Sequence, residues 1–489
     1  MKKTTRNIII ALAVLLVLGI AAAALMLTEP ETVEEETSSS SAVEETAKII
    51  DKAITDVESV VLENNESGET LTMIPTKSEE DREENNTFTL EGWEEEPVIN
   101  ANVLNVASKF YSITPSKELG EVEDLAEYGL KGDGEFKATV NYTDGTSDVI
   151  IVGTQAGETY GRYALYNDLV YIIPVSSYLA NDKLDFISTE VYTIPDIVTT
   201  DEDGNETTET AEMQKARLSG TNYPDAIQLS LSDDAILTYE ISEPIFAGAS
   251  TTHWELMVEQ LQTITASGAI AVQATEEEIA EYGLDDPTNV IEYTLNDESH
   301  TIRLGTLDSG FYSMMVDDNT TIYLIQESSV DSWAGCGLFD FRDAYIYLAY
   351  IKYVETLTIT TEDTTDVYNI TRIENEEKST ETTPYYDLEV AKDGQAIDYD
   401  NYQPFYQMLL SVSVLNEELR EPEGEPILTI HYDFFDGDEE HEVCFYEDTS
   451  AERRCIVTLD GAASGVVRSS DVEKILEAVP VIAANESVE

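Results

Sequence analysis

The chain has 489 residues, with 99 Asp and Glu against 26 Lys and Arg, which gives a formal net charge of −73. So acidic a surface repels nucleic acid and anionic lipid headgroups, and we exclude both as partners. A hydrophobic share of 42% excludes a chain that is disordered throughout, and three Cys cannot form a disulfide scaffold.

The first predicted element is a transmembrane helix. An uncharged apolar run extends from Ile8 to Leu27 and follows three basic residues. As a helix it would be about 30 Å long, which is the thickness of a bilayer's hydrocarbon core. Because basic flanks stay on the cytoplasmic side, we predict a single-pass protein of the cell membrane with a cytoplasmic N-terminus and an extracytoplasmic bulk. The alternative is a signal peptide that is cleaved near residues 21–24.

Beyond this anchor we predict three tandem repeat units, separated by acidic segments poor in core residues. The predicted boundaries are 1–27 for the cytoplasmic stub and anchor, 28–56 for an acidic tether, 57–185 for repeat unit 1, 186–224 for an acidic linker, 225–340 for repeat unit 2, 341–352 for a joint, 353–480 for a divergent repeat unit 3, and 481–489 for a tail.

The repeat is marked by the motif "DLAEYGL" at 124–130, which recurs as "EIAEYGL" at 278–284. Each copy follows a predicted helix and precedes alternating apolar segments, such as "FKATVNY" and "VIEYTL", that are joined by two-residue turns. This pattern indicates antiparallel β-meanders with one wet face. The predicted fold class is therefore α+β: an N-terminal transmembrane helix followed by tandem repeats of β-meander plus helices. The third unit lacks the motif.

The motif itself has the physical features of a helix end. We expect Gly129 and Gly283 to adopt the left-handed conformation just past a helix, with the following leucine folded back on it. Thr275 and Glu278 have the spacing of a capping box at the start of the second helix. The sequence therefore predicts a structural role for the motif.

No motif for catalysis, phosphate binding or dinucleotide binding occurs in the chain. Four potential metal ligands gather in the last hairpins: His431, His441, Cys444 and Cys455. If Asp436 and Gly437 form the turn, His431 lies opposite Glu442 and Tyr432 opposite His441, which places the ligands on both faces of the sheet. We therefore predict unpaired thiols, no catalytic, cofactor-binding or metal residues, no cofactor, and no enzyme activity.

Several segments resemble the bacterial family called domain of unknown function 4340. In the second unit they are "LTYEISEPIFAG", "HWELMVEQLQTITA", "EEEIAEYGLDDP" and "TIRLG"; in the first they include "FTLEGWEEEPV" and "EDLAEYGL". The resemblance covers most of 57–480, although "LREPEGEP" replaces the motif in the third unit. It implies an exported, membrane-anchored protein that accompanies an ABC-type exporter of the class linked to gliding-motility components, and it transfers no functional residues.

The leading functional hypothesis is a non-catalytic, membrane-anchored extracytoplasmic protein of the cell envelope. Its β-rich repeats would serve protein interaction, as an auxiliary to an ABC-type export system. The alternative is an extracytoplasmic module that binds glycans or cations, suggested by 27 Tyr and by the acidic loops. A third hypothesis is an enzyme with an unfamiliar carboxylate site.

Overall fold

The computed structural model describes most of the chain beyond its first 46 residues. The described ranges are 47–78, 84–157, 161–175, 182–200, 206–209, 211–232, 238–379, 384–415, 419–435 and 440–488. The segment predicted to span the membrane, Ile8 to Leu27, lies outside these ranges, as does the predicted turn at Asp436 and Gly437.

Within the described ranges, no helix is both long enough and apolar enough to cross a membrane. The longest described helix is α7 (Ser469–Ala483), whose 15 residues extend about 22 Å, against about 30 Å for the hydrocarbon core. Among the described residues, the predictions of an N-terminal transmembrane helix and of a single-pass localisation in the cell membrane are therefore not borne out.

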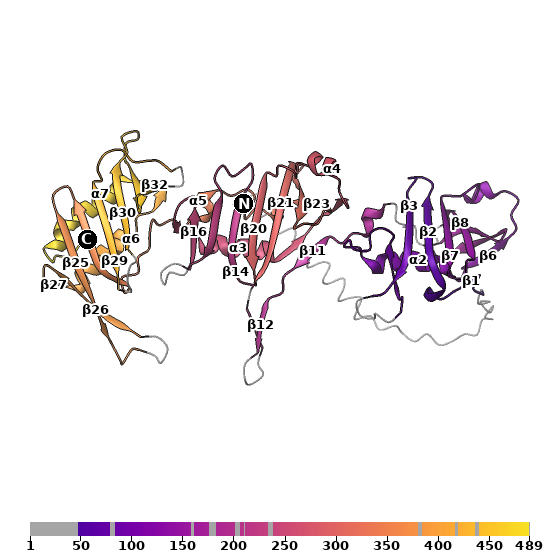
Figure 1. The fold of residues 1–489 in the computed structure, drawn as a ribbon, viewed down its shortest axis with the longest axis horizontal. Coiled ribbons are helices and arrows are strands. Elements are labelled where there is room, and N and C mark those ends of the chain that lie inside the picture. Colours follow the sequence, from indigo (N-terminus) through magenta and orange to yellow (C-terminus); the bar gives the residue numbers. More distant parts are fainter. Residues whose placement is uncertain are drawn as a thin grey trace, which may run out of the picture. The chain divides into compact units, whose positions relative to one another are not determined.

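The described chain is mainly β, built on three antiparallel sheets of eight, nine and nine strands (Figure 1). We call each sheet with its helices and short flanking elements a module: the first module spans 50–173, the second 213–341 and the third 354–483. A single 12-residue helix covers the first sheet and another covers the second, and only the third module has two long helices. The predicted α+β class is therefore wrong, because helices are a minor cover on large sheets.

The first sheet has the strand order β4-β3-β2-β7-β8-β9-β10-β6. Its strands are β2 (Val57–Asn64), β3 (Thr70–Thr76), β4 (Thr87–Leu90), β6 (Lys117–Gly120), β7 (Phe136–Tyr142), β8 (Ser147–Gln155), β9 (Arg162–Tyr166) and β10 (Leu169–Ile173). Helix α2 (Asn100–Tyr111) buries Val103, Val106, Ala107 and Phe110, which join the core formed by the sheet. A short pair, β1 (Ile50–Asp51) with β5 (Ser112–Ile113), and the turns η1 (Ile54–Asp56) and η2 (Leu125–Tyr128) complete the module.

The second sheet has the order β17-β16-β15-β14-β20-β21-β22-β23-β19. Its strands are β14 (Met213–Ser219), β15 (Ile227–Leu231), β16 (Tyr239–Glu243), β17 (Ala247–Gly248), β19 (Gly268–Ala271), β20 (Asn289–Leu295), β21 (Glu298–Asp308), β22 (Phe311–Val316) and β23 (Ile322–Gln326). Its helices are α3 (Thr251–Gln262), α4 (Glu276–Glu281) and α5 (Leu338–Phe341), with the turns η3 (Lys183–Phe186) and η4 (Glu327–Ser329) before and after the sheet.

The third sheet has the order β27-β26-β25-β24-β29-β30-β31-β32-β28. Its strands are β24 (Val354–Thr361), β25 (Thr365–Glu374), β26 (Tyr386–Lys392), β27 (Gln395–Ile397), β28 (Val414–Leu415), β29 (Leu428–Phe434), β30 (Glu440–Glu447), β31 (Arg454–Leu459) and β32 (Ala462–Arg468). Helices α6 (Tyr399–Leu410) and α7 contact each other and bury their apolar residues in the core of this sheet.

The three sheets share one topology. In each, the strands that precede the helix occupy one side, a four-strand meander occupies the other, and the strand that follows the helix closes the far edge: β6, β19 and β28. The strands at the sheet edges have only two to four residues, whereas inner strands reach 11. The third module, which lacks the repeated motif, therefore keeps the architecture of the other two.

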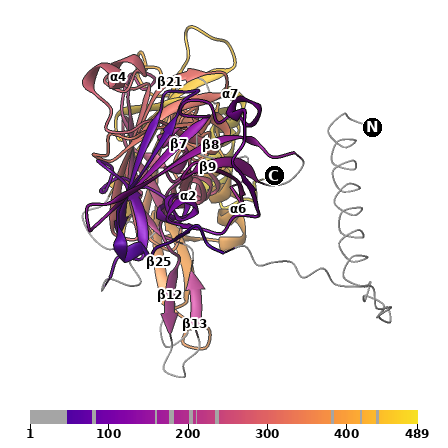
Figure 2. The ribbon, with the colours of Figure 1, turned by 90° about the vertical axis from the view of Figure 1, so that its right-hand side faces the viewer.

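The segment predicted as an acidic linker, 186–224, consists largely of strands. β14 is an inner strand of the second sheet and pairs with β20. β11 (Glu190–Thr193) pairs with β18 (Thr263–Thr265) beside helix α3. β12 (Ile197–Thr200) and β13 (Glu206–Glu209) form a two-stranded ribbon that extends away from the other strands (Figures 1 and 2).

Candidate functional site

The repeated motif forms a helix end in both modules, as predicted. Gly129 has φ +67° and Gly283 has φ +70°, both in the left-handed region. In the first copy, Leu130 N–H donates to the Leu125 carbonyl at 2.9 Å and Gly129 N–H donates to the Ala126 carbonyl at 3.2 Å. The second copy repeats both bonds at 2.9 and 3.0 Å. This is the hydrogen-bond pair of a Schellman motif, so the predicted structural role is confirmed.

The motif docks on a glycine of the neighbouring strand. A Cβ atom at Gly153 would lie closer than 3.0 Å to the carbonyl oxygen of Tyr128, and one at Gly305 would meet the Tyr282 carbonyl in the same way. Gly305 lies five residues after His300 of β21, and Tyr446 lies five residues after the equivalent His441 of β30. The third module therefore has a bulky side chain at the position of the docking glycine, and it lacks the motif as well.

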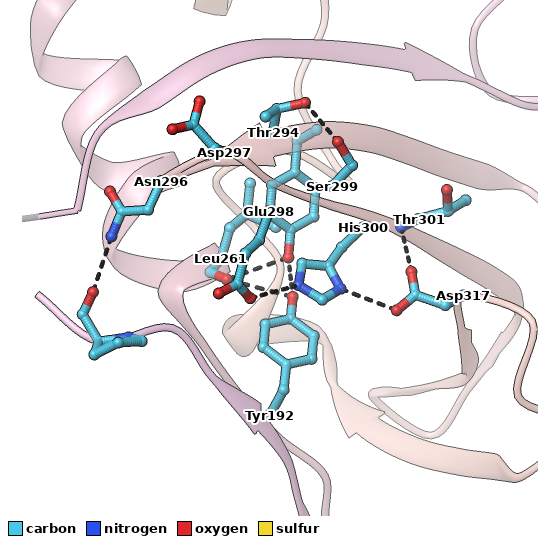
Figure 3. Close-up of polar contacts among 12 residues, drawn as sticks. Tyr192, Leu261, Thr294, Asn296, Asp297, Glu298, Ser299, His300, Thr301 and Asp317 are labelled. Atoms are coloured by element: carbon cyan, nitrogen blue, oxygen red, sulfur yellow. Dashed lines mark hydrogen bonds and ion pairs between the residues drawn. The ribbon is translucent and has the colours of Figure 1, made fainter.

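The candidate site is a half-buried polar node on β21, centred on His300 (Figure 3). Its Nδ1 lies 2.9 Å from Oδ2 of Asp317, and because a carboxylate only accepts, Nδ1 carries the proton. The second oxygen of Asp317 accepts the N–H of Thr301 at 2.8 Å, and the N–H of Asp317 donates to the Thr301 carbonyl at 2.8 Å. The carboxylate thus fixes both the imidazole and the strand that bears it.

Two tyrosines enclose the imidazole. Tyr192 of β11 stacks on His300, with ring centroids 4.5 Å apart and planes within 5°. Its hydroxyl contacts that of Tyr293, and both lie 3.3 Å from the Leu261 carbonyl. Burial, and next to it the charge of Asp317, raises the pKa of Tyr293. Nε2 of His300 is 3.9 Å from Oε2 of Glu298, which is too far for a hydrogen bond.

The third module repeats the node. Nδ1 of His441 lies 2.8 Å from Oδ2 of Asp460, whose other oxygen accepts the N–H of Glu442 at 2.8 Å. The N–H of Asp460 donates back to the Glu442 carbonyl at 2.8 Å. Phe246 stacks on His441, with centroids 5.6 Å apart and planes within 6°. Asp317 and Asp460 also share φ +52°.

The first module has a carboxylate at the equivalent position. Asp148 precedes Gly153 by five residues, as His300 precedes Gly305. It accepts hydrogen bonds from the hydroxyls of Tyr142 at 2.7 Å and Tyr166 at 2.9 Å. Each module therefore has one polar node at the same place in its second meander strand.

A His–Asp pair can orient an imidazole for acid–base chemistry, but that chemistry needs a neighbouring nucleophile and room for a substrate. A cavity of about 1250 Å³ lies in the third module and one of about 440 Å³ in the first, and neither is lined by His300 or His441. The side chain of His300 is only 17% exposed. In both nodes the aspartate bonds to the histidine and to the backbone of its strand, and an aromatic ring stacks on the imidazole.

The four predicted ligands of the last hairpins do not converge. The expected pairing is confirmed, with His431 opposite Glu442 and Tyr432 opposite His441. Cys444 and Cys455 are free thiols, as predicted. Burial raises the pKa of Cys455 to about 11, with a smaller contribution from nearby carboxylates.

The structure does bring together a group that was missed in the sequence. His431, Asp433 and Glu440 offer ligand atoms within 4.8 Å of one another on the outer face of the β29–β30 hairpin, and they could hold a divalent cation. Nε2 of His431 lies 3.3 Å from Oδ1 of Asp433 and 3.6 Å from Oε2 of Glu440. The sequence signal for this group was the pair His431 and Asp433 on one strand, with Glu440 opposite Asp433 on the next strand.

Comparison with known families gives one result. Residues 241–418 match the model of a family described as a domain of unknown function, DUF4340. The match runs from β16 of the second module to a point shortly after β28 of the third, so the predicted resemblance is confirmed over that range. No curated protein and no solved structure matches the chain. Fold and nodes together define a mainly β protein of three like-built modules.

Proposed function

We infer that the protein is a non-catalytic interaction protein, whose three modules offer binding surfaces to another protein. The observation that carries this proposal is the recurrence of the polar node. Its histidine and carboxylate bond to each other and to the backbone in two modules, at positions that line neither cavity described above. As the family resemblance implies, the proposed partner is a membrane-protein component of an ABC-type export system.

One carboxylate of the larger cavity, that of Asp448, also supports a non-catalytic role. Burial favours the neutral form of Asp448, but hydrogen bonds from Ser450, the charge of Arg420 and the N–H of Ala451 outweigh it and lower its pKa. A general acid near neutral pH needs the opposite shift. Arg420 Nη1 also lies 2.8 Å from Oδ2 of Asp448, which ties this carboxylate to the fold.

Cross-linking in intact cells tests the proposal. A lysine-reactive reagent should join exposed lysines of the modules, such as Lys378 and Lys474, to the same protein in independent preparations, with the linked peptides identified by mass spectrometry. An Asp317→Asn variant, which disturbs a node but no surface lysine, should keep these links. Recovery of links within the chain only would contradict an interaction role.

Cation binding is a second candidate, favoured by the group His431, Asp433 and Glu440. Zinc titrated calorimetrically into the full-length chain should bind with one-to-one stoichiometry, and His431→Gln should abolish this binding. His300→Gln serves as the matched control, since that imidazole is held by Asp317. Equal losses in both variants would assign the heat to diffuse binding on the acidic surface.

A further inference from the structure

The third module contains a groove that has not been given a role. The groove has a volume of about 1250 Å³ and is bounded on one side by α7. The other side is formed by residues 361–366 at the β24–β25 turn, 425–427 before β29, and 447–455 between β30 and β31. We call it the α7 groove. Helix α7 follows the last strand of the third sheet, whereas the last strand of the second sheet is followed by the short turn η4.

The groove follows the whole length of the helix. Its α7 residues recur every three or four positions and form one stripe: Ser469, Val472, Glu473, Leu476, Val479, Pro480 and Ala483. A helix of 15 residues is about 22 Å long. Val472 and Val479 are buried in the core of the module, and the apolar side chains that α7 exposes to the groove are Leu476, Pro480 and Ala483. The shape and lining therefore suit an elongated occupant with an apolar side.

The rim of the groove carries negative charge. Eight acidic and three basic residues line it. Of the basic ones, Lys392 is bound to Asp366 at 3.1 Å and to Asp393 at 3.4 Å. Most of the remaining acids have no such partner among the ion pairs described, and Glu473 and Glu425 face the groove from opposite walls. An occupant with positive charge along its polar side would complement this rim.

We propose that the α7 groove binds a basic amphipathic helical segment of a partner protein. The inference rests on the proposed interaction function and names the chemistry of the partner at one surface. An apolar face would pack on the α7 stripe, and lysines or arginines would lie against the acidic rim, as in other helix-in-groove complexes. A second copy of this chain is a poor occupant, because two chains that each carry a net charge of −73 repel each other.

Fluorescence anisotropy with the full-length chain tests the proposal. The probe is a labelled 18-residue peptide of Leu and Lys with helical spacing, compared with a scrambled peptide of the same composition and with a peptide in which Glu replaces Lys. We expect the patterned Leu–Lys peptide to bind, the scrambled one to bind at least fivefold more weakly, and the Leu–Glu peptide not to bind.

Two charge reversals on one helix provide a matched pair. Glu473→Lys alters a residue that lines the groove, and Glu477→Lys alters an exposed residue one turn away that does not. We expect Glu473→Lys to weaken binding at least fivefold and Glu477→Lys to leave it within twofold. Equal weakening in both, equal binding of the scrambled peptide, or no binding would overturn the proposal.

Two further measurements distinguish a different occupant of the α7 groove and test the groove separately from the proposed interaction function. If a monomeric cationic surfactant, dodecyltrimethylammonium, binds with the same dependence on Glu473 while the peptide does not, the groove takes a small amphiphile and the proposal is wrong. If the protein cross-linked in cells is retained by Glu473→Lys, the α7 groove is not its docking site, although the proposed interaction function stands.

Discussion

Replacing Gly305 with alanine should separate the repeated motif from its sheet. A Cβ at this position would lie 2.5 Å from the Ser313 hydroxyl oxygen and closer still to the Tyr282 carbonyl. Both contacts are well inside 3.0 Å, so the turn must move. Overpacking of this kind costs roughly 1–3 kcal/mol.

Moving the turn also breaks two hydrogen bonds. The Tyr282 carbonyl accepts the N–H of Thr306 at 3.1 Å and the hydroxyl of Ser313 at 2.8 Å. Each bond contributes about 0.5–1.5 kcal/mol. Together with overpacking, we expect the free energy of local opening to fall by roughly 3 kcal/mol, which corresponds to about a hundredfold in an equilibrium constant.

Hydrogen exchange with mass spectrometry measures this change locally. The amides of Gly283 and Leu284 donate to the helix carbonyls, and in the Gly305→Ala variant they should exchange about a hundredfold faster. Gly268→Ala is the matched control, because a Cβ there meets nothing within 4 Å and the φ angle is ordinary. If the two variants exchange within threefold of each other, the docking argument is refuted.

Three further predictions follow from the capped helix and from the third module. Burial alone would raise the pKa of Asp460, but hydrogen bonds from His441 and from the N–H of Glu442, together with the imidazole charge, outweigh it and lower the pKa. The stability that this carboxylate adds is present above about pH 3.9 and is lost as the pH falls through its folded pKa. Asp460→Asn should flatten that pH dependence in urea titrations of the third module. Thr275→Ala should destabilise its helix by about 1 kcal/mol through loss of the capping box, whereas Thr252→Ala on the exposed side of α3 should change urea unfolding by less than about 0.5 kcal/mol. Cys455, with its pKa raised to about 11, should react with iodoacetamide at pH 8 at least about a hundredfold more slowly than free cysteine, as peptide-resolved mass spectrometry would show.

Features set by neighbouring residues were predictable from the sequence. The segment "FKATVNY" is β7 (Phe136–Tyr142), and its alternating burial is the pattern that predicted it. The Thr275 and Glu278 capping box forms as its spacing indicated. The left-handed glycines of the motif and the pairing of His431 with Glu442 across a hairpin are likewise local properties.

Features that depend on distant partners were not predictable. β14 alternates buried Met213, Ala216 and Leu218 with Lys215 and Arg217, which gives a weak signal inside an acidic segment. Its place is set by β20, which follows about seventy residues later. The predicted α+β class gave the helices too much weight, because the size of each sheet depends on pairing between strands that are remote in sequence.

The polar node could have been found by aligning the repeats on their glycines. That alignment places Asp148 beside His300, but the third module conceals the match because Tyr446 replaces the glycine. The partner of His300 lies 17 residues away and that of His441 lies 19 residues away. Only the folded meander brings each pair together.

The brevity of the edge strands limits how other chains can join this protein. An incoming strand needs a run of free backbone N–H and C=O groups to form a ladder, and edges of two to four residues offer few. A longer free edge would be a template for further strand pairing. Recognition is thereby directed to side chains on the faces and along the helices, where it can be selective.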